Sequence, residues 1–447
     1  MKSSLNKFSL VCGFATATTM LFANPADPQV TNVKATQDSS RMVTITYDLD
    51  EAAIVTMDVL TNGVSIGGAN VRYVTGDCNQ IVAAGTGRQI KWSAHQSWPG
   101  QKFTEPVVSF RVKAWAKDAP PDVMVVDLTA SGGAGTQKYY ESLENLPGGL
   151  LGNDIYRKTL MVMRRIHAAD VPWTMGNVTD NLDASWNIRN AARETAHTVT
   201  LPSDYYMAVF EVTQKQWQTL TGAWAGYYTK ADCREMRPVE SVTYAQIRGA
   251  DYPTAPADGS FVKAMRTKTG FDFDLPAEAQ WEYACRAGTG EGVWNTGVAY
   301  KFGKTFCNTL VKDGISYWGS TRAGGGSDAW QDVNMPGRWY APGNNWGGSV
   351  ANIGTWTGTA TAGSYAPNAW GLYDMHGNAT EVCLDKFADD ITANTQGEVV
   401  TMGSNYAARG GCSMSPSSGC RSSARDGWDG AATKKVGVRL ICPLAAN

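Results

Sequence analysis

Short runs in which apolar and polar residues alternate dominate the first quarter of the chain. The segments 43–47, 54–59, 89–92 and 107–112 all have a period of two, and Gly, Asn and Asp separate them. This pattern is typical of antiparallel strands in a two-sheet β-sandwich. We therefore predict an all-β, immunoglobulin-like sandwich over residues 28–118. It shows no catalytic constellation, so its expected role is spacing or docking.

The remainder of the chain has a different pattern. A proline pair at 120–121 marks a stiff boundary, and residues 123–446 combine short strands with long Gly- and Asn-rich loops. Two helices are predicted there. One covers residues 213–220, with Thr213 as its N-cap, and the other covers residues 277–286. Mixed short strands with few helices indicate an α+β domain.

The N-terminus predicts export. An apolar run at 8–22 follows Lys2 and Lys7, and Ala23 offers a small residue for cleavage. The run is too short and too interrupted by threonine to span a bilayer well. We interpret residues 1–23 as a signal peptide of bacterial type, leaving no membrane span after its removal. The alternative is an N-terminal anchor helix.

Composition narrows the function classes further. The formal net charge is −2 and charged residues make up 18% of the chain, with no basic stripe, so nucleic-acid binding is not expected. Of nine cysteines, Cys12 leaves with the signal peptide and eight remain, with Cys78 alone in the first domain. An even number in an exported chain is compatible with disulfides, but sequence leaves their pairing open.

A series of motifs in the second region occurs in the order of one known family. They lie at 171–176, 210–217, 237–244, 275–284, 368–378, 409–411 and 436–440. Residues 123–446 thereby resemble the formylglycine-generating-enzyme, or sulfatase-modifying-factor, family. The resemblance implies a fold with a C-type-lectin-like core and little regular secondary structure. Members oxidise a sulfatase cysteine to formylglycine, carry out iron chemistry on small thiols, or simply bind ligands, so function must be tested at the residues.

The oxidase function depends on two cysteines that follow the Arg-Gly-Gly motif and bind Cu(I) as thiolates. The matching positions here are Ser415 and Cys420. Cu(I) requires soft sulfur ligands, which a serine hydroxyl does not replace. Cys412 precedes Ser415 by three residues, and in an extended segment that odd offset puts the two side chains on opposite faces, unless a bulge near Pro416 changes the register. We therefore expect no Cu(I) binding and no oxidase activity, with Cys420 as the catalytic thiol only under the oxidase alternative.

The resemblance also favours a structural bridge between Cys383 and Cys420, which would leave the latter without a thiolate. Cys412 is then a small buried residue or a partner of Cys442. Iron chemistry is not expected, since the four histidines lack the close spacing of a metal motif.

Calcium is the metal that the resemblance implies. The ligands would be the Asp374 side chain, the backbone carbonyls of Gly377 and Ala379, and the Glu381 carboxylate. Hard oxygen donors of this kind suit Ca²⁺. The alternative is that Asp374 and Glu381 only cap loop amides.

Two further groups of residues admit a structural or a binding role. Charged side chains near the C-terminus form either an ion-pair network or a groove, namely Asp385, Arg421, Arg425 and Asp426. Tryptophans either pack in the core or stack on a ligand, namely Trp330, Trp346, Trp356 and Trp370.

These observations favour an exported two-domain binding or structural protein. Its second domain would be catalytically silent and would hold a peptide, a glycan or a partner protein on a surface built from loops. The competing hypothesis is an enzyme that converts a sulfatase cysteine to formylglycine.

Overall fold

The structure is a computed structural model that describes residues 27–100, 107–133, 135–176, 193–229, 231, 233–289, 311–312, 315–316, 359–364, 367–413, 415 and 417–444. The chain forms two compact units. The first comprises Met1–Met124 and Gln137–Asn153, and the second comprises Val125–Thr136 and Asp154–Ala446. Within the described residues, no helix is long and apolar enough to cross a membrane. The predicted signal peptide and the tryptophans at 330, 346 and 356 lie outside the described residues.

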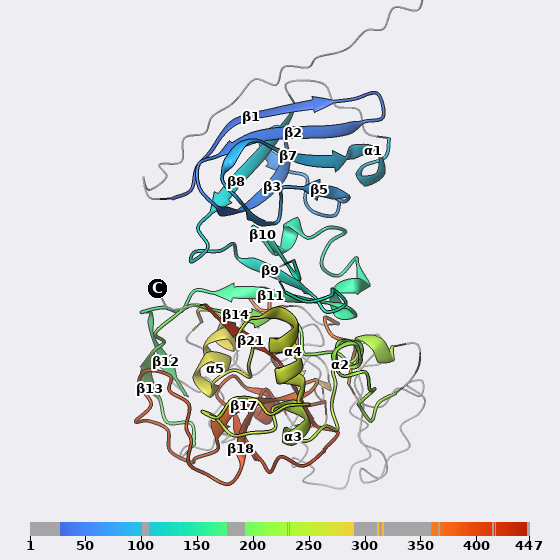
Figure 1. Cartoon of the computed structure of the whole chain (residues 1–447). Coiled ribbons are helices and arrows are strands. Elements are labelled where there is room, and N and C mark those ends of the chain that lie inside the picture. The colour runs from blue at the N-terminus through green and yellow to red at the C-terminus, as the bar shows by residue number, and fades with distance from the viewer. Residues whose placement is uncertain are drawn as a thin grey trace, which may run out of the picture. The chain divides into compact units, whose positions relative to one another are not determined.

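The first unit is built almost entirely from antiparallel strands (Figure 1). One sheet has the order β1-β2-β7-β5, and the other has the order β4-β3-β6 with β8 also paired to β3. The elements are β1 (Val30–Gln37), β2 (Met42–Leu49), β3 (Ala53–Thr61), β4 (Val64–Ser65), β5 (Val74–Gly76), β6 (Gln80–Val82), β7 (Gly85–Ser93), α1 (Ala94–Ser97), β8 (Val108–Trp115), β10 (Gln137–Tyr140) and the 3₁₀ turn η1 (Leu143–Asn145).

The core of the first unit follows from the alternating pattern. Along β2, every second side chain is buried, including Val43, Ile45 and Tyr47. They pack in one apolar cluster with side chains of both sheets, such as Trp92 of β7 and Val55 of β3. Two sheets sharing one core make a sandwich, so the predicted all-β architecture is confirmed.

A segment beyond the predicted sandwich completes this unit. Strand β3 is buried on both faces, because its polar residues Thr56 and Asp58 are covered as well as its apolar ones. The Thr56 hydroxyl donates to Glu141 (3.3 Å), and Arg111 bridges Asp58 (3.0 Å) and Glu141 (2.8 Å). These contacts explain why Gln137–Asn153 belongs to the first unit.

In its described residues, the second unit contains two main sheets and two two-stranded ribbons. In the first sheet β9, β11, β14 and β21 are neighbours in that order, and the second sheet has the order β19-β18-β17-β20, with β17 and β20 parallel. The strands are β9 (Val123–Asp127), β11 (Leu160–Ile166), β12 (Pro172–Met175), β13 (His197–Thr200), β14 (Tyr205–Ala208), β15 (Val311–Lys312), β16 (Ile315–Ser316), β17 (Thr380–Lys386), β18 (Tyr406–Arg409), β19 (Arg425–Trp428), β20 (Val436–Gly437) and β21 (Ile441–Pro443).

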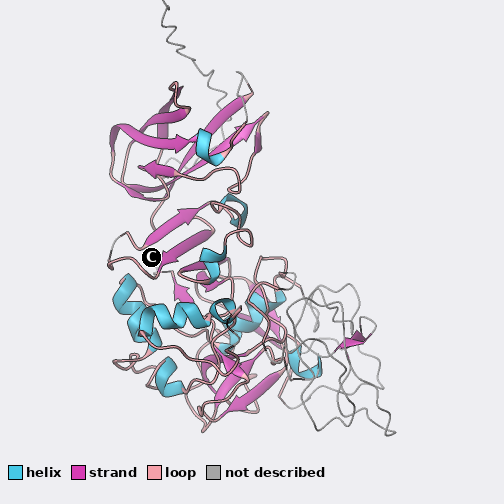
Figure 2. Ribbon diagram, turned by 90° about the vertical axis from the view of Figure 1, so that its right-hand side faces the viewer, coloured by secondary structure: helices cyan, strands magenta, loops and turns pink. Residues whose placement is uncertain are grey.

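Four of the five described α-helices belong to the second unit (Figure 2). They are α2 (Gln214–Thr221), α3 (Tyr244–Ile247), α4 (Phe261–Thr269) and α5 (Glu278–Arg286), with 3₁₀ turns η2 (Asp154–Arg157), η4 (Arg234–Met236) and η6 (Ser417–Cys420). Both predicted helices, α2 and α5, are confirmed. Thr213 caps α2 and forms a capping box with Gln216. Helix α4 was not predicted, although Ser260 caps it and Gly270 ends it in the left-handed conformation.

Helix α5 organises the core of the second unit. It packs against β12, β17 and β18. Its Trp281 is fully buried and lies in one cluster with Met375 and with Cys383 of β17. The fold observed here agrees with the predicted α+β class. Through α5, the loop around Met375 and the second sheet are held together.

Candidate functional site

The loop before β17 is held in place by one buried carboxylate. Glu211 accepts hydrogen bonds from the Asn378 side chain (2.6 Å) and from the Ala379 backbone N–H (2.8 Å). Asp374 and Asn378 both adopt left-handed backbone conformations, with φ of 60° and 62°. The Gly377 N–H donates to the Gly410 carbonyl (2.7 Å), so this loop abuts the Arg-Gly-Gly turn.

The four predicted calcium ligands lie in this loop and in β17, but Glu381 is already committed. Arg439 donates to both of its oxygens (2.6 and 2.8 Å), and the Trp281 indole N–H donates to it at 2.6 Å. Arg439 also donates to backbone carbonyls, including that of Tyr373 (2.8 Å). A calcium ion would have to displace a buried guanidinium from the same oxygens. The arrangement therefore does not fit calcium at Glu381, and the four-ligand site stays a prediction.

Asp374 is the least satisfied member of this group. One of its oxygens accepts the Gly363 N–H (2.6 Å), and the other is buried without a hydrogen-bond partner. Burial raises the pKa of Asp374 to about 6, and burial followed by the charge of Asp374 raises that of Glu211. Both shifts favour the protonated forms of these two carboxyl groups. Within the described residues, no group of three or more His, Cys, Asp or Glu side chains has the arrangement of a metal site.

The segment after the Arg-Gly-Gly motif is a turn and not an extended strand. The Ser415 N–H donates to the Cys412 carbonyl (2.8 Å), and the Cys412 N–H donates to the Ser415 hydroxyl (2.9 Å). The Cys412 sulfur lies 3.4 Å from the Ser415 oxygen. The predicted opposite-face placement of these two side chains is therefore wrong. The turn brings them together because the serine hydroxyl accepts the amide of Cys412.

Cys420 lies at the end of η6 and has no exposed surface. A Cβ on Gly411 would lie 2.8 Å from its sulfur, so only glycine fits there. The Cys420 carbonyl accepts the Nδ1–H of His376 (2.6 Å). Cys383 is a buried free thiol in β17, so the bridge expected between Cys383 and Cys420 is not formed. Cys412 is likewise a free thiol and does not pair with Cys442.

His376 is buried in its neutral form. Burial lowers its pKa to about 4, and the carbonyl of Cys420 fixes the proton on Nδ1. The other ring nitrogen lies 3.7 Å from the sulfur of Cys285 and is left to accept from that thiol. Burial raises the pKa of the Cys285 thiol, so this pair is a neutral hydrogen-bonded contact and not an ion pair.

Three of the four charged residues predicted near the C-terminus form ion pairs or hydrogen bonds with partners that the sequence did not suggest. Arg421 pairs with Glu194 (2.6 Å), and Arg425 pairs with Glu278 (2.6 Å). Asp385 accepts the backbone N–H groups of Glu278 (2.7 Å) and Val400 (3.0 Å). These residues therefore join segments that are far apart in the sequence. The fourth residue of the predicted set, at position 426, is exposed.

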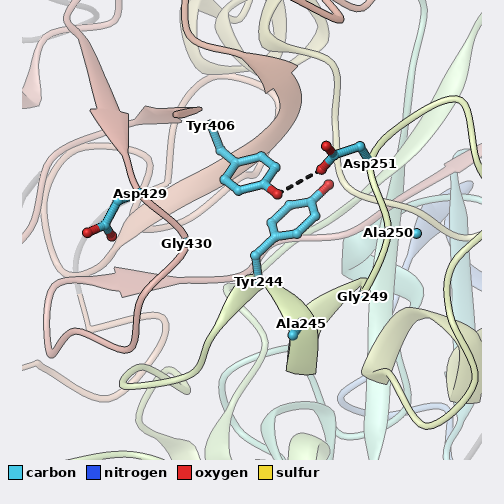
Figure 3. A pocket seen from close by; sticks show the side chains of 8 residues that line it. All are labelled: Tyr244, Ala245, Gly249, Ala250, Asp251, Tyr406, Asp429 and Gly430. Atoms are coloured by element: carbon cyan, nitrogen blue, oxygen red, sulfur yellow. Dashed lines mark hydrogen bonds between the residues drawn. The ribbon is translucent and has the colours of Figure 1, made fainter. Parts of the chain in front are cut away.

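A pocket of about 380 Å³ lies between α3, the start of β18 and the loop after β19 (Figure 3). Eight residues line it, namely Tyr244, Ala245, Gly249, Ala250, Asp251, Tyr406, Asp429 and Gly430. The rings of Tyr244 and Tyr406 stack with centroids 3.6 Å apart and an angle of 13° between their planes. Tyr244 begins α3, which Thr243 caps with a second capping box.

The polar groups of this pocket are partly paired with one another. The Tyr406 hydroxyl donates to Asp251 (2.7 Å), and the Lys386 ammonium lies 3.0 Å from the other oxygen of Asp251. That ammonium is also 3.7 Å from the centre of the Tyr406 ring. Burial alone would raise the pKa of Asp251, but the hydrogen bonds from Tyr406 and Lys386 outweigh it and hold that pKa below its usual value. The Tyr244 hydroxyl is buried and has no hydrogen-bond partner.

The architecture and motifs correspond to one family. Residues 171–444 match the sulfatase-modifying factor enzyme 1-like domain, and this match covers more than half of the 447-residue chain. The chain belongs to this family. A comparison with curated proteins gave no match.

The solved structures to which this chain is similar include three proteins. Treponema denticola variable protein 1 is 22% identical, with a TM-score of 0.42, over 64% of this chain and 95% of that one. PvdO from Pseudomonas aeruginosa is 20% identical, with a TM-score of 0.42, over 63% and 94%. CarF is 17% identical, with a TM-score of 0.33, over 62% and 99%.

Within this family domain, the structure brings some of the predicted site residues into contact and pairs others with residues outside the predicted site. Cys412 and Ser415 meet in one turn, whereas Glu381 serves Arg439. Trp370 is partly buried and packs against the core beside Tyr283, with ring centroids 5.2 Å apart. The pocket was not predicted, because a stacked tyrosine pair from distant segments leaves no local signal in the sequence.

Proposed function

We propose that this protein is an exported ligand-binding protein whose sulfatase-modifying-factor-like domain does not generate formylglycine. The proposal depends mainly on the hydroxyl group of Ser415 and on the hydrogen bond that it accepts. It supplies a hydroxyl where the oxidase needs a thiolate, and that hydroxyl accepts the Cys412 amide in a tight turn. A protonated hydroxyl is a poor ligand for Cu(I), so the pair of soft ligands is incomplete.

The surroundings of Cys420 support the same proposal. Its side chain is fully buried, and the tight approach of Gly411 leaves no space above the sulfur. Substrate oxidation requires a thiolate that both copper and a peptide cysteine can reach. A sulfur enclosed in this way is not accessible to a peptide substrate.

One observation favours the oxidase alternative enough to be tested. The Cys412 sulfur faces Ser415 at 3.4 Å, so a second thiol lies beside the position where the family has one. Under that alternative, Cys412 and Cys420 would act as the thiol pair. The same experiment can therefore examine both cysteines.

The deciding experiment uses the mature full chain loaded with Cu(I). Aerobic conversion of a sulfatase-type Cys-x-Pro-x-Arg peptide is followed by mass spectrometry, with Cys420→Ser and Cys412→Ser beside the wild type. We expect no conversion by any of the three proteins. Conversion by the wild type that disappears in Cys420→Ser would overturn the proposal, and its loss in Cys412→Ser would identify the replacement ligand.

A further inference from the structure

The loop that follows α2 presents two large aromatic side chains to solvent. Trp224 is 41% exposed and Tyr227 is 64% exposed. A single exposed aromatic residue is ordinary on a protein surface, but Trp and Tyr are also the residue types that dominate the binding energy of protein interfaces. Two of them on one short loop, residues 223–229, make this segment a candidate interaction surface. We call it the aromatic loop.

Buried polar groups fix the backbone of the aromatic loop. Glu240 has no exposed surface and accepts the backbone N–H groups of Tyr227 (2.6 Å) and Tyr228 (3.0 Å). The buried Gln214 amide donates to the Tyr228 carbonyl (3.1 Å), and a Cβ on Gly226 would lie 2.5 Å from that amide. Because the backbone is already ordered, a partner that binds here pays little conformational entropy for the loop.

Each of the two exposed rings has a cation over it. The Arg234 guanidinium lies 4.4 Å from the centre of the Trp224 ring, and the Lys215 ammonium lies 5.5 Å from the same centre. The Lys434 ammonium lies 5.3 Å from the centre of the Tyr227 ring. Attraction between a cation and an aromatic face holds these charges beside the rings.

In the part of the chain that the structure describes, these three cations form no ion pair. Arg234 and Lys215 donate to neutral side-chain amides (3.3 and 2.9 Å). The neighbouring acid Glu235 pairs with Lys158 (3.0 Å). Even if Glu240 beneath the loop is counted as ionised, three cations minus one anion leave two positive charges. This excess favours a partner that carries carboxylates.

We propose that the aromatic loop and its three cations bind an acidic segment of a partner protein. The inference rests on the proposed binding function and names the class of its ligand. An acidic glycan has the same charge, but a sugar ring stacks on an open aromatic face, and each ring here already has a cation over a face. Side-chain carboxylates need only the cations, and the combination of Trp, Tyr and Arg is typical of protein interfaces.

The test measures binding to the mature full chain by ligand-observed NMR titration. The acidic probe is acetyl-Glu-Leu-Glu-Leu-Glu-amide, and its neutral match is acetyl-Gln-Leu-Gln-Leu-Gln-amide. Trigalacturonate carries the same number of carboxylates on a glycan. We expect the acidic peptide to bind at least about fivefold more tightly than the neutral peptide and than trigalacturonate, and its affinity to fall as salt rises.

Variants locate the binding. Lys434→Gln removes one charge and Tyr227→Ala removes one ring, and each is expected to weaken binding of the acidic peptide roughly threefold or more. Both side chains are exposed, so the urea denaturation curves should match that of the wild type. The matched controls are Lys34→Gln and Tyr73→Ala, which lie exposed in the first unit and should leave binding unchanged.

The outcomes separate the hypotheses. Tighter binding of the acidic peptide that both loop variants weaken and both controls retain supports the proposal. Equal binding of the acidic and neutral peptides, or undiminished binding by both loop variants, overturns it and leaves the proposed function standing. Trigalacturonate binding more tightly than the acidic peptide also overturns it, in favour of an acidic glycan. Aerobic conversion of the sulfatase-type peptide overturns the proposed function instead, and the peptide titration remains interpretable beside it.

Discussion

The two units of this protein stabilise their interiors in different ways. In the first unit, alternating apolar side chains such as Ile45 and Trp92 fill the space between two sheets. Its buried acid Asp58 pairs with Arg111, whose side chain is 47% exposed. In the second unit, six arginines are among the largest fully buried side chains, namely Arg237, Arg248, Arg286, Arg409, Arg421 and Arg439.

This difference shows where each unit is sensitive to substitution. An apolar core loses stability in proportion to the cavity that a substitution creates. A buried ion pair adds little over an apolar pair of the same shape, but breaking it strands a charge away from water. The second unit should therefore depend on single charged residues, whereas the first should depend on its apolar pattern.

Arg439→Met is expected to have the largest effect. It leaves Glu381 buried without its guanidinium and removes the donor to the Tyr373 carbonyl. We expect a loss of about 3 to 5 kcal/mol in the free energy of unfolding, measured by urea denaturation. The matched substitution Arg111→Met in the first unit should cost less, about 1 to 2 kcal/mol, because Asp58 keeps the hydrogen bonds from the Val59 N–H and the Ser65 hydroxyl.

A double variant distinguishes the cost of an unpaired buried charge from a general failure to fold. Arg439→Met combined with Glu381→Leu removes both charges, so it should recover part of the stability lost in the single variant. If the double variant is no more stable than the single one, or if Arg111→Met is as damaging as Arg439→Met, the contrast between the two units is wrong.

Ile45→Ala tests the apolar side of the comparison. This fully buried residue of β2 should lose about 3 kcal/mol through the cavity it leaves. Its neighbour Thr46 points to the other face and is half-buried, so Thr46→Ala is expected to change the unfolding free energy by less than about 1 kcal/mol. Urea denaturation of both variants gives the measurement. Equal losses would contradict the alternating pattern.

His376 makes the second unit sensitive to acid. Its folded pKa of about 4 lies below the ordinary value of 6.5, so its contribution is full above pH 6.5 and is lost as pH falls towards 4. Between about pH 8 and about pH 5 this loss amounts to roughly 2 kcal/mol. His376→Asn keeps a donor for the Cys420 carbonyl and cannot titrate. The difference in unfolding free energy between wild type and variant should therefore shrink on acidification, and a constant difference would argue against a buried neutral histidine.

Apart from the control variants, Thr213→Ala should give the smallest effect. It removes the hydroxyl that accepts the Gln216 N–H (3.2 Å) at the start of α2 and donates to the Arg157 carbonyl (2.8 Å). We expect a loss of about 1 kcal/mol by urea denaturation. Thr213→Ser retains the hydroxyl and should stay close to wild type. A loss in the serine variant as large as in alanine would mean that packing of the methyl group, and not capping, stabilises this helix end.

Local patterns in the sequence determined a large part of the fold. Alternation along β2 placed Ile45 in the core of the first unit, and Thr213 marked the start of α2. The motif order indicated the family, which the match over residues 171–444 confirms. These features are readable because strand periodicity and helix capping act between residues only a few positions apart.

Only the tertiary structure decided which charges and rings meet. Arg421 pairs with Glu194 across 227 positions in the sequence, and Glu381 pairs with Arg439 across 58. The turn that joins Cys412 to Ser415 replaced a predicted extended segment, because one hydroxyl accepts one amide there. Buried charges and stacked rings select their partners by proximity in space, and sequence spacing does not encode that proximity.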